Sequence, residues 1–223
     1  MDGLESLFSQ QEYQDLTVHF SGLAVSSENR SAFDEVVDDP VSFTVRCSRA
    51  ASTDFDKTGL VVWPASERLA RLLLEDYGHL LADKRVLELG CGAGLVALVA
   101  SRFASSVMAT DGDGQVVQMA RGMPNKPPNL DFEVYEWGGF LGESFDVIVG
   151  ADVAHWPHAV SGLITTIKSY LRPQGVCFLS GTNRGSNQLQ FVRNSLTAAG
   201  LSLTPVASKS SSCDDYIWKV CHV

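Results

Sequence analysis

The chain has 223 residues, of which 45% are hydrophobic and 19% are charged, and its formal net charge at pH 7 is −9. A chain of this length can bury a core without disulfide bonds or a structural metal, and no run of about 20 apolar residues predicts a membrane span. The negative charge excludes a phosphate backbone as a main source of affinity, so we expect neither a nucleic-acid partner nor a membrane partner.

The compartment follows from the start of the chain and from the cysteines. Residues 1–5 lack the basic start and apolar stretch of a signal peptide. The five cysteines are scattered, without a Cys-x-x-Cys pair or zinc-like spacing to a histidine, so we expect reduced thiols and no metal site. We therefore expect the protein in the cytoplasm, with the nucleus as a second compartment.

Residues 1–58 predict a small β extension. Residues 16–20 and 41–45 alternate apolar and polar side chains, as half-buried strands do, and the polar, acidic stretch between them is typical of a loop. This section is too short for a core of its own, so we expect it to pack on a domain formed by residues 59–223.

From residue 59 onward, strands and helices alternate. Pro64 opens a helix, where its missing N–H costs nothing, and Leu69, Leu72, Leu73 and Leu80 give that helix an apolar stripe. Further helices are predicted at 95–103, 113–122, 158–171 and 186–199. Strands are predicted at 85–89, 107–110, 132–135, 145–149, 175–179, 201–206 and 216–220.

The alternation predicts the fold class. Strands separated by helices form a parallel sheet covered on both faces, whereas the last two strands follow each other directly and predict an antiparallel edge hairpin. We therefore expect an α/β fold: a Rossmann-like seven-strand sheet, mostly parallel, with an antiparallel edge pair and the N-terminal β extension.

The sharpest motif is the glycine loop Gly90-Cys91-Gly92-Ala93-Gly94, which joins a strand to a helix. Glycines there let the backbone approach a ligand, at the sheet edge where ligands bind. The dinucleotide fingerprint has glycines at i, i+2 and i+5 to seat a pyrophosphate, but here they fall at i, i+2 and i+4. Glu88 before the loop would repel a pyrophosphate and attract an ammonium. S-adenosylmethionine (SAM) carries an ammonium and no phosphate, so the loop favours SAM over NAD; a plain tight turn is the alternative.

Asp111 ends the second strand of this unit, 17 residues after Gly94. A carboxylate there can accept hydrogen bonds from both ribose hydroxyls of a nucleoside cofactor. The alternative role is the N-cap of the next helix, which Asp often provides at a strand–helix junction. Together with the glycine loop, ribose binding is the favoured interpretation.

These residues resemble the class I SAM-dependent methyltransferases, and more narrowly methyltransferase family 16, which modifies lysines of non-histone proteins. Four segments carry the resemblance over residues 59–223: 59–65, similar to the family's Val-Trp-x-Ala entry; the loop at 88–96; 136–138, similar to its Asp-Trp-Gly; and 149–152, similar to the end of its fourth strand. The family also carries a β extension before the domain.

The resemblance implies a cofactor site and an acceptor site. Trp63 would pack beside SAM and Trp137 against its adenine, although either indole could instead be a core side chain. Asp152 would face the acceptor. The implied cofactor-binding residues are Trp63, Glu88, Gly90, Cys91, Gly92, Gly94, Asp111, Trp137 and Ala151.

The chain departs from the family after Asp152. The family has Asp-x-x-Tyr or Asp-x-x-Phe, whose aromatic ring supports the acceptor's positive charge, whereas this chain has His155 followed by Trp156. His155 could accept a proton from the incoming amine, or be a hydrogen-bonded loop residue, and Trp156 could take the aromatic role. The implied catalytic residues are Asp152 and His155.

The sequence therefore predicts a SAM-dependent N-methyltransferase that acts as a monomer on a lysine of a protein substrate, without a metal. One alternative keeps SAM but changes the acceptor to a small-molecule amine, a pyridine nitrogen, histidine or arginine. Another is a catalytically inactive scaffold, for which the residue at position 155 is the support. An NAD-dependent dehydrogenase is disfavoured by the glycine spacing and by the closing hairpin.

Overall fold

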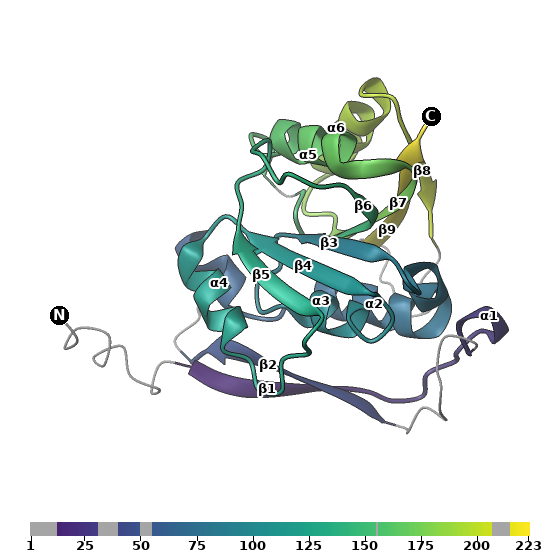
Figure 1. Ribbon diagram of the computed structural model, residues 1–223. Helices are drawn as coiled ribbons and strands as arrows, with labels where there is room; N and C mark the ends of the chain where they lie inside the picture. The colour runs from purple at the N-terminus through teal and green to yellow at the C-terminus, as the bar shows by residue number, and fades with distance from the viewer. Residues whose placement is uncertain (1–12, 31–39, 50–54, 155, 207–214) are drawn as a thin grey trace.

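The computed structural model of the chain describes residues 13–30, 40–49, 55–154, 156–206 and 215–223. The strands from residue 85 onward are β3 Arg85–Leu89, β4 Ser106–Asp111, β5 Leu130–Val134, β6 Phe145–Ala151, β7 Leu171–Thr182, β8 Leu201–Pro205 and β9 Asp215–His222. They form one seven-stranded sheet in the order β5-β4-β3-β6-β7-β9-β8 (Figure 1). The Rossmann-like seven-strand sheet expected from the sequence is confirmed.

Strands β5, β4, β3, β6 and β7 pair in parallel, whereas β9 is antiparallel to both of its neighbours, β7 and β8. The predicted antiparallel pair is therefore present. Its order differs from chain order, because the later strand β9 lies inside the sheet and β8 forms the edge. Pro205 ends β8, in keeping with an edge strand that need not donate every ladder hydrogen bond.

Helices cover both faces of the sheet. One face carries α2 Pro64–Leu72, α3 Leu95–Ala100 and α4 Gly114–Arg121, and the other carries α5 Val160–Tyr170 and α6 Ser186–Ala198 (Figure 1). Each face has its own buried apolar cluster. The central strand β6 is almost continuously apolar, as a strand buried on both faces must be. None of the helices in the described ranges has both the length and the apolar character that a bilayer crossing requires.

The helix that begins at Pro64 changes geometry along its length. After Leu72 it continues as a π-helical turn at Leu73–Tyr77 and a 3₁₀ turn at Gly78–Leu81. The buried Asn29 amide donates to the carbonyls of Leu73 and Leu74, at 2.9 and 2.6 Å. The Leu73 carbonyl also accepts the Gly78 N–H of the π-helical turn, so Asn29 adds a second donor there and supplies one to the Leu74 carbonyl.

Asn29 belongs to α1 Ser27–Arg30, which follows β1 Tyr13–Phe20 and precedes β2 Val41–Ser48. Both strands of the predicted β extension are present; they pair antiparallel in a two-stranded sheet of their own, and β2 contacts α3 and α4 (Figure 1). The N-terminal hairpin thus supports the helices beneath the first half of the main sheet, on the side away from α5 and α6.

Candidate active site

A cavity of about 1060 Å³ opens at the carboxyl ends of the parallel strands. Residues that follow β3, β4, β5, β6 and β7 all contribute to its wall, together with the segment that enters α2. This is the edge at which α/β sheets bind ligands, and the volume is that of a site for a drug-sized or nucleoside-sized molecule. The predicted residues on its wall are Trp63, Gly90, Cys91, Gly92, Asp111, Trp137, Ala151 and Asp152.

The glycine loop shapes the floor of this cavity. Gly90 has φ +64°, and a Cβ there would lie 2.8 Å from Cγ1 of Val153. Gly94 has φ +80°, and its Cβ would lie 2.9 Å from the Phe132 ring, behind the described wall of the cavity. Gly90 therefore keeps the floor open, whereas Gly94 serves the entry into α3 and its packing against β5.

Asp111 lies between the loop and the cavity. Its carboxylate accepts hydrogen bonds from the backbone N–H groups of Gly92 and Asp113, both at 3.1 Å. The N-cap of α4 is Asp113, which accepts from the Gln115 N–H at 2.7 Å, so Asp111 does not take the capping role that the sequence left open. Burial raises the pKa of Asp111. Each of its oxygens keeps a further lone pair for a donor in the cavity, such as a ribose hydroxyl.

Glu88 lies beneath the loop and not on the described wall. Its side chain is 2% exposed, and Oε2 accepts a hydrogen bond from the Ala97 N–H at 2.9 Å. Burial raises the pKa of this carboxyl to about 8, so it is mainly protonated near neutral pH. Because the carboxyl is protonated and lies off the described wall, this geometry does not favour the contact between Glu88 and a cofactor ammonium that the sequence suggested. Glu88 instead joins the loop to the first turn of α3.

The two tryptophans present flat faces to the cavity. Trp137 follows β5, packs partly on the apolar cluster of the α5–α6 face, and also lines the cavity. The backbone of Gly162 in α5 makes room for it, because a Cβ there would lie 2.9 Å from the Trp137 carbonyl oxygen. Trp63 stands at the entry to α2, and its indole Nε1–H donates to the Thr58 carbonyl at 2.7 Å. The Trp63 ring is thus held in orientation by its hydrogen bond, whereas Trp137 packs closely on Gly162 through its backbone and Cβ.

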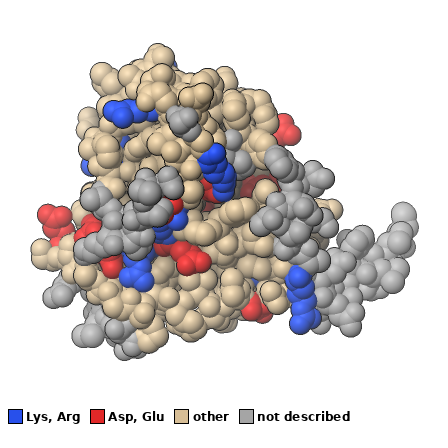
Figure 2. All heavy atoms as spheres, turned by 180° about the vertical axis from the view of Figure 1, so that it is seen from behind, with Lys and Arg blue, Asp and Glu red and all other residues tan. Residues whose placement is uncertain are grey.

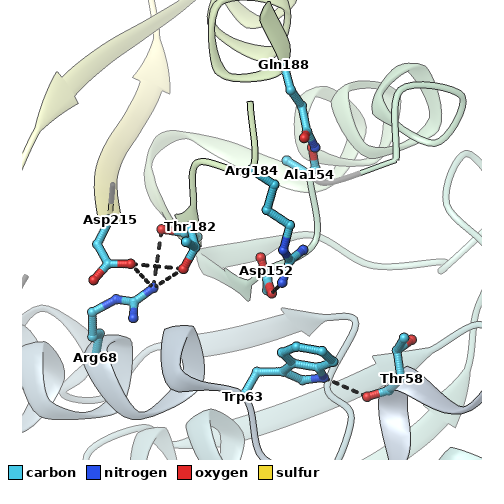
Figure 3. A network of polar contacts seen from close by, with 10 residues as sticks. Thr58, Trp63, Arg68, Asp152, Ala154, Thr182, Arg184, Gln188 and Asp215 are labelled. Carbon is cyan, nitrogen blue, oxygen red and sulfur yellow. Dashed lines mark hydrogen bonds and ion pairs between the residues drawn. The ribbon is translucent and has the colours of Figure 1, made fainter. Parts of the chain in front are cut away.

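Asp152 follows β6 at φ +59°, a left-handed conformation that non-glycine residues rarely adopt. Its backbone N–H donates to the Ser180 carbonyl at 2.7 Å, which ties the residue to β7. The Asp152 side chain is 9% exposed, lines the cavity, and forms an ion pair with Arg184 (Figure 3). Backbone strain of this kind is concentrated at functional sites, where the surrounding contacts hold it.

The other predicted residues are placed as follows. Ala151 ends β6 and pairs with Ser180. Cys91 is 6% exposed, and burial raises the pKa of its thiol well above the usual range, so it is a neutral part of the floor. His155 lies outside the described residues, and its predicted role stays a prediction.

Sequence reasoning missed Arg184 and several other wall residues, among them Glu136, Asp113 and Val116. Arg184 follows the end of β7, next to β6 in the sheet. Its position after a parallel strand was the available signal, because every such loop opens at the same edge. The arginine itself stood in a polar stretch with no motif around it.

The cavity wall is acidic. Among the wall residues, Asp111, Asp113, Glu136 and Asp152 oppose Arg184 alone of the lysines and arginines. This charge repels a pyrophosphate and favours a cation. On the face shown in Figure 2, Lys and Arg side chains are interspersed with Asp and Glu side chains.

The cavity fits SAM. Gly90 and Gly92 leave space that a Cβ would fill, Asp111 offers acceptors for ribose hydroxyls, and Trp137 offers a flat face for adenine. SAM carries a sulfonium and an ammonium, which suit the acidic wall. Glu88 and Gly94 are predicted residues that lie off the described wall of the cavity, so this fit does not use them directly.

The chain is similar in sequence to known methyltransferases. A family model described as "Methyltransferase domain" matches residues 64–203. The protein-lysine N-methyltransferase EFM3 of Chaetomium thermophilum is 29% identical over 178 residues, which cover 71% of this chain and 52% of that protein. The protein N-lysine methyltransferase METTL21A of Xenopus tropicalis is 30% identical over 139 residues, which cover 59% of this chain and 64% of that protein. The matched regions thus span about half of the first relative and just under two thirds of the second.

Solved structures share the fold. The ribosomal protein L11 methylase from Lactobacillus delbrueckii subsp. bulgaricus superposes with a TM-score of 0.53, over 77% of this chain and 81% of that chain, at 18% identity. At this identity the likeness concerns the arrangement of strands and helices.

Proposed function

Since the chain belongs to the methyltransferase-domain family, we propose that it transfers a methyl group from SAM to the ε-amine of a lysine in a protein substrate. The observation that carries the proposal is the strained, nearly buried carboxylate of Asp152 on the wall of a cavity that fits SAM. A carboxylate at that place attracts and orients a cationic side chain. The names of the relatives EFM3 and METTL21A support lysine as the acceptor.

The residues of the chain have three tasks in this reaction. When bound, SAM supplies a methyl group on a sulfonium, so transfer forms a C–N bond, breaks an S–C bond and releases one proton. Asp152 would orient the acceptor nitrogen toward the cavity, and His155 would accept the proton. The surrounding apolar side chains of Val61, Val62 and Val153 limit the access of water.

The proposal is tested with the full chain, radiolabelled methyl-SAM and a fractionated cell extract. We expect a labelled protein band whose label, after hydrolysis, elutes with methylated lysine. Label in a small-molecule fraction, or in methylated histidine or arginine, would replace lysine as the acceptor. A protein that binds SAM but labels nothing in any fraction would support the scaffold alternative.

Asp152→Asn keeps the shape of the side chain and removes its charge. We expect SAM affinity to hold while turnover falls by about tenfold or more, which corresponds to ~1.4 kcal/mol in the barrier. The matched control is Asp146→Asn, because Asp146 begins the same strand and pairs with Arg172 at 2.7 Å, away from the cavity wall. Equal losses of turnover in the two variants would remove Asp152 from the acceptor site.

A further inference from the structure

Arg184 holds a position that a substrate cation would need. Its guanidinium donates to the Asp152 carboxylate, and its Cζ lies 5.4 Å from the centroid of the Trp63 ring (Figure 3). All three side chains line the same cavity. Asp152 and Trp63 therefore form a site for one cation, between a carboxylate and an indole face, and the Arg184 guanidinium occupies it.

The side chains of Trp63 and Asp152 are held in position, whereas the Arg184 side chain can move away from them. The Trp63 ring is held by its hydrogen bond to Thr58, and Asp152 is held by its backbone bond to Ser180. The Arg184 side chain is 38% exposed and lies just beyond β7, next to Gly185. The Asp152 carboxylate is only 9% exposed, so the more exposed Arg184 side chain can leave it at low cost when another cation takes its place.

A second arginine nearby shows the contrast. Arg68 in α2 is 9% exposed and pairs with the equally buried Asp215 at 2.9 Å, while its Nη2 also donates to Thr182 Oγ1 at 2.9 Å (Figure 3). A charge buried in this way cannot leave its partner without a large desolvation cost. Arg68 therefore has a structural role, whereas Arg184 lines the cavity and can exchange with another cation.

We propose that Asp152 and Trp63 form the acceptor-cation subsite, and that Arg184 occupies it until the acceptor's ammonium displaces it. This rests on the proposed function, and it assigns to Trp63 the aromatic support that the sequence lacks at position 155. Trp63 and Asp152 then contact the substrate, whereas Arg184 is a specificity-determining residue. Only a cationic side chain that reaches both Asp152 and Trp63 can displace it.

The test measures cation binding directly and does not depend on turnover. The probe is Nα-acetyl-L-lysine methylamide, whose ε-ammonium is free, titrated into the full chain with and without S-adenosylhomocysteine. The readout is the NMR signal of the Trp63 indole N–H, assigned by its loss in Trp63→Leu. The variants are Arg184→Ala and the control Arg172→Ala, which removes another exposed arginine paired with an aspartate.

We expect Arg184→Ala to bind the probe about fivefold more tightly than wild type, because no side chain then has to leave the subsite before the probe binds. Arg172→Ala should match wild type. Asp152→Asn should weaken probe binding in the NMR titration, and Trp63→Leu, which lacks the reporter signal, should weaken it in calorimetry. In both variants, affinity for S-adenosylhomocysteine, also measured by calorimetry, should stay within about twofold of wild type.

Equal or weaker probe binding in Arg184→Ala, with thermal unfolding like that of wild type, would overturn the proposal. A Trp63→Leu variant that loses affinity for S-adenosylhomocysteine would return Trp63 to the cofactor. Failure of the proposed function would look different: wild type would bind no S-adenosylhomocysteine or label no extract protein, while the probe titrations without cofactor would still decide the role of Arg184.

Discussion

Replacing Glu88 by glutamine tests the electrostatics beneath the glycine loop. Gln is nearly isosteric, keeps an oxygen to accept from the Ala97 N–H, and cannot ionise. In the folded protein, burial raises the pKa of Glu88 from its usual value of 4.5 to about 8. Between these pH values the folded chain holds a proton that the unfolded chain has released, so the free energy of unfolding falls as the pH rises.

The magnitude follows from the size of the window. At ~1.4 kcal/mol per pH unit, the loss of stability from about pH 5 to about pH 8 is on the order of 4 kcal/mol for a group that stays dry. The Glu88→Gln variant should lack this loss. Its stability relative to wild type should therefore rise with pH, whatever the other groups do, because their titration is common to both chains.

The assay is urea unfolding of both cofactor-free chains at several values between about pH 5 and about pH 8.5, followed by circular dichroism. Parallel stability curves for the two chains would refute the reasoning and would mean that water reaches the carboxyl. The same variant also tests whether Glu88 touches the cofactor ammonium. If it does, SAM binding near neutral pH should release a proton in wild type, and Glu88→Gln should abolish that release.

Four further outcomes are expected. Asp111→Ala should weaken SAM binding by roughly 1.5 to 3 kcal/mol in calorimetry, since two hydrogen bonds to a charged group are lost; an unchanged Kd would move the ribose elsewhere. Trp137→Ala should fold but bind SAM several-fold more weakly, and a fall in Tm with unchanged affinity of the folded fraction would make Trp137 only a core residue. His155→Phe should lower turnover near neutral pH and flatten the pH–rate profile, whereas held or raised activity would leave His155 without a proton-transfer role. Gly94→Ala should destabilise by about 2 to 4 kcal/mol, and Gly200→Ala, at the same φ of +80° but with open space around its Cβ, by clearly less in urea unfolding; equal losses would mean that φ alone matters.

Local patterns in the sequence were enough to predict most of the fold. Alternation of period two located β1 and β2, and Pro64 located the start of α2, because each depends on residues adjacent in the chain. The position of β9 between β7 and β8 could not be read in this way. Two strands in succession predict an antiparallel pair, and which of them joins the rest of the sheet depends on packing far along the chain.

The same distinction between local patterns and distant contacts applies to the candidate site. Residues of the glycine loop and of strand ends were predicted because motif and topology coincide there. The neutral, buried state of Glu88 and the ion pair of Arg184 with Asp152 were not, since both depend on burial and on neighbours distant in sequence. For Asp111 the structure removes the capping alternative, because Asp113 caps α4, and ribose binding stays a prediction.

The interior place of β9 has a consequence for the order of folding. Strand β8 contacts the sheet through β9, so β8 has no partner to pair with until β9 has been made and brought back across it. Until then Arg68 also lacks Asp215, and burying its guanidinium early would be unfavourable. We therefore expect the β9 end of the sheet to assemble last, as one cooperative step in which the strand pairing and the buried ion pair form together, and to exchange its amide hydrogens as one unit.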